Sequence, residues 1–193
     1  MPNIWECPTS VIVNGHEYPI RTDYRVVIDL LTALNDPECR DEDETVNNYI
    51  QTSLILQIMF PEKVAADDIP EALKAIKDFI DMGMEGNDER QKPRLMDWEQ
   101  DAGLIIPAVN RVMGKEIRAE KYIHWWTFLA AYMEIGECSF SNILHLRIKK
   151  SKGKKLEKWE QEYIAENKNL VLLGQKKTEE EKAEEEKLLS IFG

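Results

Sequence analysis

Apolar residues at helical spacing are the feature that most limits what this chain can fold into. They recur three or four positions apart in short segments, and proline or glycine stops most of these segments. In the first half the segments are residues 26–34, 45–60 and 73–80, stopped at Pro37, at Pro61 and at the stretch from Gly83 to Gly86. Such spacing predicts amphipathic helices that each bury one face. The sequence therefore predicts a mostly α fold, a bundle of several helices.

A small β-hairpin is expected before the first helix. Residues 10–13 and 16–20 are β-prone runs on either side of Asn14-Gly15, a dipeptide that fits a type I′ turn because both positions accept positive φ. Pro19 has no amide donor, so the second strand should lie at an edge. Either Thr22 or Asp23 then caps the first helix.

The second half continues the helical pattern. Residues 96–113 trace one helical face, but Pro107 lies inside it and removes an amide hydrogen bond, so we expect a kink or two shorter helices. Another helix should start at Ser139, and residues 155–173 predict one more.

The segment 119–135 is the most aromatic part of the chain. We expect it to be a helix whose rings lie in the core, because aromatic side chains bury large apolar areas. These rings are Tyr122, Trp125, Trp126, Phe128 and Tyr132.

The domain organisation follows from these segments. A chain of 193 residues suffices for one domain with a substantial core. We expect residues 1–85, the hairpin and three helices, to pack as one body with the helical region 95–173. Residues 174–193 are rich in glutamate and lysine and predict a charged helical arm.

Charge limits the partners of this chain. The net charge is −11, so the surface should be acidic and should repel a phosphate backbone, which makes nucleic acid a disfavoured partner. Lysines cluster within residues 149–158, and Trp159 and Tyr163 nearby offer rings for base stacking. Glutamates interleave with these lysines, which favours a solvated helix face or a contact with an acidic protein.

Motifs for catalysis, cofactors or membranes are not found in the sequence. It has no phosphate-binding glycine loop, nucleophile elbow or metalloprotease motif, and its three cysteines lack zinc-site spacing. No apolar run approaches the roughly 20 residues that span a bilayer, and the first residues lack the pattern of a signal peptide. We therefore expect a cytosolic protein that is no enzyme and holds no cofactor or metal. For His124, a packed or surface histidine is favoured over a metal ligand or a general base.

The end of the charged arm is unusual in its apolar residues, which share a helix face: Leu188, Leu189, Ile191 and Phe192. A charged arm is commonly just solvated helix or disordered chain. Apolar residues at helical spacing also dock in the groove of a partner. Both interpretations stay open, and the four residues are candidates for a partner contact.

Several motifs of residues 95–165 together resemble one family. They are Asp-Trp-Glu-Gln-Asp-Ala-Gly-Leu-Ile at 97–105, Val-Met-Gly-Lys-Glu-Ile at 112–117, Tyr-Ile-His-Trp-Trp-Thr-Phe at 122–128, Phe-Ser-Asn-Ile at 140–143 with Arg147, and Lys-Lys-Leu-Glu-Lys-Trp-Glu at 154–160. This pattern resembles the siphophage and prophage proteins labelled gene product fifteen, from which Pro107 departs. The signature positions are Asp101, Ile105, His124, Trp125, Trp126, Phe128, Phe140 and Arg147.

The resemblance implies a role in phage tail morphogenesis, because genes of this family usually lie between those of the major tail protein and the tape measure. By analogy, the chain is expected to be a tail assembly chaperone that binds the tape measure protein, the major tail protein or both, in the host cytoplasm. A permanent structural component of the tail or virion is the main alternative, and a DNA-binding regulator that uses the lysines is a minor one. A homo-oligomer also stays open.

The signature residues are expected to have a structural role. The aromatic ones should pack the core, and Asp101 should pair with Arg118 or Arg147 at its edge.

Overall fold

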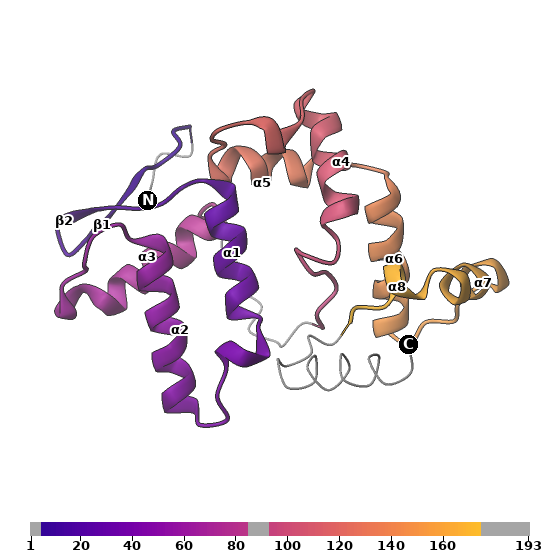
Figure 1. Cartoon of the computed structure of the whole chain (residues 1–193), viewed down its shortest axis with the longest axis horizontal. Coiled ribbons are helices and arrows are strands. Elements are labelled where there is room, and N and C mark those ends of the chain that lie inside the picture. The colour runs from indigo at the N-terminus through magenta and orange to yellow at the C-terminus, as the bar shows by residue number, and fades with distance from the viewer. Residues whose placement is uncertain (1–4, 85–92, 175–193) are drawn as a thin grey trace, which may run out of the picture.

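The computed structural model describes residues 5–84 and 93–174, and these residues form a mostly α fold with a β-hairpin at the N-terminus (Figure 1). This confirms the predicted fold class. The elements are β1 (Ser10–Val13), β2 (His16–Pro19), α1 (Tyr24–Leu34), α2 (Glu44–Met59), α3 (Ile69–Ile80), α4 (Ala102–Met113), α5 (Trp125–Met133), α6 (Ser139–Ser151), α7 (Lys158–Glu166) and α8 (Lys168–Val171). Short 3-10 turns occupy Pro37–Cys39, Ala66–Asp68 and Ile117–Ala119. The predicted arm lies outside the described residues from residue 175 on.

The hairpin forms at the predicted turn. Asn14 and Gly15 have φ angles of 49° and 84°, and β1 pairs with β2 in antiparallel register, with Val13 opposite His16. Val11 and Val13 are buried and face inward, because alternate residues of a strand point to the same side. The inward face of β1 packs on α3.

Capping decides where the first helix begins. Of the two candidates, Asp23 caps α1, since its side chain accepts a hydrogen bond from the amide of Arg25. α2 runs antiparallel beside α1 and ends before Pro61 (Figure 1). α2 also contacts α3, and Met59 is its single buried residue.

Pro107 does not split its helix in two. α4 is one helix from Ala102 to Met113, and it begins later than the segment 96–113 that the spacing predicts. The missing amide of Pro107 leaves the carbonyl of Gly103 without its helical partner, and Gly103 is exposed, so water reaches this end of the helix.

α5 also begins later than the predicted residue 119. Residues before Trp125 are extended, because an isolated antiparallel bridge joins His124 to Asp23. Two backbone bonds hold it, from the amide of Tyr24 to Ile123 at 3.0 Å and from that of Trp125 to Thr22 at 2.7 Å. The spacing of apolar residues cannot reveal such a bridge.

The segment 155–173 is likewise not one helix. It divides into α7 and α8 at Asn167, whose φ of −120° and ψ of 39° leave the helical region.

The main core cluster takes side chains from both predicted regions, 1–85 and 95–173. A smaller cluster of Ile143, Leu146 and Val171 joins α6 to α8. None of the helices in the described part of the chain combines the length and the apolar character that crossing a membrane requires.

Candidate partner-binding site

His124 fixes the start of the helix that carries the aromatic signature residues. Its Nδ1 accepts a hydrogen bond from the amide of Trp126 at 3.0 Å, so the histidine acts as the N-cap of α5. Its Nε2 lies 2.9 Å from the carbonyl oxygen of Pro8. Only a neutral ring with its proton on Nε2 makes both bonds, because Nδ1 must accept and Nε2 must donate. The buried His124 thus ties the N-terminal segment to α5.

Both tryptophans of the signature bind the end of α3. The indole of Trp125 donates to the carbonyl oxygen of Ile80 at 2.9 Å, and that of Trp126 donates to the carbonyl oxygen of Phe79 at 2.8 Å. The last carbonyls of a helix lack their usual partner within it, and the indole supplies one for Ile80, while the Phe79 carbonyl also accepts the amide of Met82 at 3.2 Å. Trp125 and Trp126 therefore join the N-terminal helices to the second half of the chain.

The aromatic rings of the predicted segment 119–135 pack in the core, with one exception. Trp125 stacks against Phe128 at 5.8 Å between ring centroids, and both are almost fully buried. Tyr132 contacts the buried Phe140 of α6. Tyr122, expected in the core, is 52% exposed, because it precedes α5 in the extended segment, where its hydroxyl shares a 2.7 Å hydrogen bond with Thr22.

Asp101 pairs with Arg147, one of the two arginines that the sequence offers. The two guanidinium–carboxylate distances are 2.7 and 2.8 Å, and both side chains are buried. Arg118 instead binds Glu116, its neighbour on the surface. The Asp101 carboxylate also accepts the amide of Asp97 at 2.9 Å, so the pair holds the loop before α4 in place.

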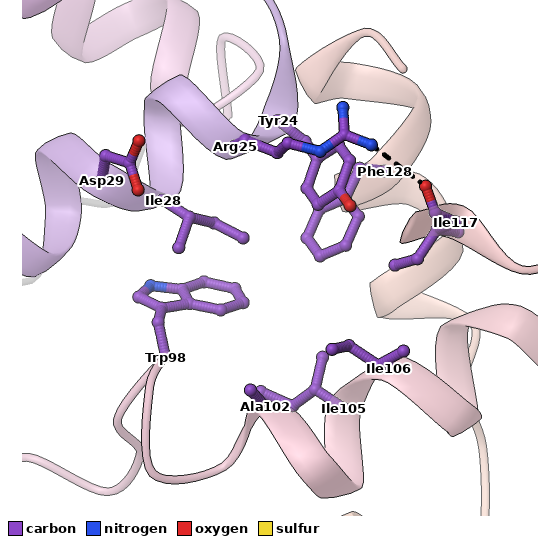
Figure 2. Close-up of a pocket in the computed structure, with 10 residues that line it drawn as sticks. All are labelled: Tyr24, Arg25, Ile28, Asp29, Trp98, Ala102, Ile105, Ile106, Ile117 and Phe128. Carbon is purple, nitrogen blue, oxygen red and sulfur yellow. Dashed lines mark hydrogen bonds between the residues drawn. The ribbon is translucent and has the colours of Figure 1, made fainter. Parts of the chain in front are cut away.

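An open cavity of about 390 Å³ lies where α1 faces α4 and α5 (Figure 2). Ten residues line it, and apolar side chains dominate: Tyr24, Arg25, Ile28, Asp29, Trp98, Ala102, Ile105, Ile106, Ile117 and Phe128. Ile28 of α1 faces the indole of Trp98 across the cavity (Figure 2). Its volume is that of a site for a small molecule or a few side chains.

One wall of this cavity is rigid. The Tyr24 ring stacks on Phe128 at 4.6 Å, and Arg25 covers Tyr24 at a similar distance from its centroid. The Arg25 guanidinium also donates to the carbonyl oxygen of Ile117 (Figure 2) and to that of Glu120. Burial raises the pKa of Tyr24, so its hydroxyl stays neutral near pH 7.

The rim carries one carboxylate. The side chain of Asp29 is exposed, and it makes no hydrogen bond or ion pair with the described residues. The cavity thus combines an apolar floor with the Asp29 carboxylate and with the Arg25 guanidinium, which already pairs with Asp23. Asp29 is left to pair with a basic neighbour of an apolar side chain bound there.

The cavity includes only two of the signature residues, Ile105 and Phe128. The other six hold the surrounding elements together, as described above for His124, Trp125 and Arg147. The candidates Leu188, Leu189, Ile191 and Phe192 lie outside the described residues.

Eight of the ten lining residues were not predicted as site residues, among them Tyr24, Ile28 and Ile117. The apolar character of these three was visible, but each also fits a helix core. Only the packing of α1 and α4 on α5 brings them together, so the sequence holds no separate signal for them.

A metal centre is not indicated in the described ranges, 5–84 and 93–174. No group of three or more histidine, cysteine, aspartate or glutamate side chains there could hold a metal ion.

Comparison with protein families gives a match over most of the chain. The model of the family described as Bacteriophage Gp15 protein matches residues 6–173. The comparisons with curated proteins and with solved structures found no match. The family match covers the hairpin, the cavity and every signature residue. The chain therefore belongs to the bacteriophage Gp15 protein family.

Proposed function

We propose that this phage protein is a tail morphogenesis protein that works as a tail assembly chaperone, binding the tape measure protein, the major tail protein or both. The observation that carries the proposal is the open apolar cavity between α1 and α4. A site of this chemistry binds side chains of an amphipathic partner helix, by the helix-in-groove mode. The role is one of binding and not of catalysis.

The proposed partners fit the surface of this chain. A tape measure protein is long, helical and apolar, so it needs cover before the tail tube forms around it. The net charge of −11 would keep such a complex soluble in the host cytoplasm, because like-charged complexes repel one another. Genes of this family usually lie between those of the major tail protein and the tape measure, which supports the same partners.

Co-expression with the cognate tape measure protein tests the proposal. We expect the wild-type chain to co-purify with it and to raise its soluble amount. Ile106→Lys places a charge in the cavity on a half-buried side chain. We expect this variant to lose at least about tenfold in affinity, the effect of removing one central apolar contact.

Val46→Lys is the matched control. Val46 is an apolar helix residue that is 43% exposed and lies on α2, away from the cavity. It should bind as the wild type does. If wild type and Ile106→Lys bound equally well, and circular dichroism showed both to be folded, the cavity would not be the binding site.

Mass spectrometry of purified phage particles separates the two kinds of tail protein. An assembly chaperone leaves before the particle is complete, so we expect this chain to be absent. Its presence in a fixed ratio to the major tail protein would assign the alternative role, a permanent component.

A further inference from the structure

A second cavity, of about 660 Å³, lies between the N-terminal segment, β1 and the C-terminal half of α3. Its floor is apolar, with Val11, Phe79 and Trp126 among the lining residues. The charged residues among those that line it are all acidic: Glu6, Asp78 and Asp81. We call this cavity the acidic groove.

The carboxylates of the acidic groove lie in an electrostatically unfavourable place. Asp78 is in the last turn of α3 and Asp81 is its C-cap, where the helix dipole adds partial negative charge. Neither forms an ion pair with any residue that the structure describes. Partial burial raises the pKa of Asp81, an effect that Lys77 opposes and Asp78 strengthens. A cation bound here would relieve this repulsion.

The opposite charge gathers at the corner between α6 and α7. Lys150, Lys152, Lys154 and Lys155 are exposed and make no ion pair within the described part of the chain. Beside them, Trp159 is 60% exposed. Four unpaired lysines next to an exposed tryptophan are unexpected in a chain with a net charge of −11. We call these five residues the basic knob.

The two surfaces cannot meet within one molecule. β1 and α3 lie at one end of its longest axis, and α7 lies at the other (Figure 1). Two copies can bring them together, because the knob supplies cations and an aromatic side chain, and the groove offers carboxylates and an apolar floor.

We propose that copies of this chain associate head to tail, with the basic knob of one copy docked in the acidic groove of the next. Trp159 lies on the apolar floor beside Phe79, and the lysines pair with Asp78 and Asp81. Such a contact uses two different patches, so it continues into a ring or a filament and does not stop at a symmetric dimer.

Sedimentation of the full chain over a range of concentrations tests the proposal. We expect the wild-type mass to rise with concentration in about 50 mM salt and to fall towards one chain in about 500 mM, since salt screens exposed charges. A wild-type chain that stays monomeric at every concentration in low salt would overturn the proposal.

Two variants separate the two surfaces. Asp78→Lys with Asp81→Lys disables the groove, and Lys154→Ala with Lys155→Ala and Trp159→Ala disables the knob. Each variant alone should be a monomer. An equimolar mixture should form dimers and nothing larger, because one intact knob meets one intact groove. Variants that are folded by circular dichroism but give no dimer on mixing would contradict head-to-tail contact.

Glu42→Lys with Glu62→Lys is the matched control. It makes the same change in net charge at two exposed positions outside the groove. It should associate as the wild type does. If it lost association as fully as the groove variant, net charge and not the groove would be responsible, which would overturn the proposal.

Discussion

At the scale of single residues, Arg147 connects several segments of the fold. Besides the Asp101 carboxylate, its guanidinium donates to the carbonyl oxygens of Leu95, Leu170 and Val171. It thereby joins α6 to the loop before α4 and to α8. Removing one partner of a buried ion pair strongly destabilises the fold, because the other charge stays buried without compensation.

Arg147→Met should lower the free energy of unfolding by about 3–5 kcal/mol, because it leaves the buried Asp101 carboxylate without its cation. Urea unfolding measures the change. Arg118→Met is the control, since Arg118 pairs with Glu116 on the surface, and it should cost less than about 1 kcal/mol. Equal midpoints for the two variants would contradict the structural role of the buried pair.

The core position of Trp125 gives a second prediction. Trp125→Ala should cost about 3–5 kcal/mol, the usual effect of removing a large buried aromatic side chain. The same substitution at the exposed Trp159 should change the urea midpoint little. An unchanged midpoint for Trp125→Ala would refute its place in the core.

At the scale of elements, the sequence predicted where most helices lie but not where all of them begin. The ends of α2 and α3 follow from proline and glycine, and the hairpin follows from Asn14-Gly15. The predicted start of α5 was wrong for two reasons. Histidine is not a residue expected to cap a helix, and the bridge that holds His124 is a tertiary contact. Apolar spacing likewise gave no sign of the break at Asn167.

Besides the packing of β1 on α3, one carboxylate attaches the hairpin to the rest of the fold. The Asp68 carboxylate accepts hydrogen bonds from the Tyr18 hydroxyl at 2.6 Å and from the side-chain amide of Asn14 at 2.8 Å. The Nδ1 atom of His16 lies 3.2 Å from the same carboxylate. These donors, Tyr18 first, hold the pKa of Asp68 at about 2, below its ordinary value of 3.8. The hydrogen bonds favour the charged form.

This attachment predicts a loss of stability in acid. Because the folded-state pKa is depressed, the contribution of Asp68 is fully present above about pH 4 and is lost as the pH falls towards 2. Asp68→Asn does not titrate, so its free energy of unfolding should fall less between about pH 6 and about pH 2.5 than that of the wild type. Urea unfolding at both pH values measures this, and equal falls would contradict the assignment.

At the scale of the whole molecule, the cavity that α1 shares with α4 and α5 is a product of packing. Its residues come from α1, from the loop before α4, from α4 itself, from the turn at Ile117–Ala119 and from α5. The family resemblance singled out Ile105 and Phe128, but it predicted that they pack in the core and not that they line a cavity. The sequence could predict that these segments are helical and apolar, yet not that they leave a space between them.

The central claim is that this cavity binds a protein of the phage tail. A photo-reactive amino acid placed at residue 106 tests it most directly, during co-expression with the cognate tape measure and major tail proteins. After irradiation, mass spectrometry should find one of these proteins joined to residue 106, and no such product when the reactive group is at residue 46. Crosslinks from residue 46 alone, in a complex that still forms, would contradict the claim.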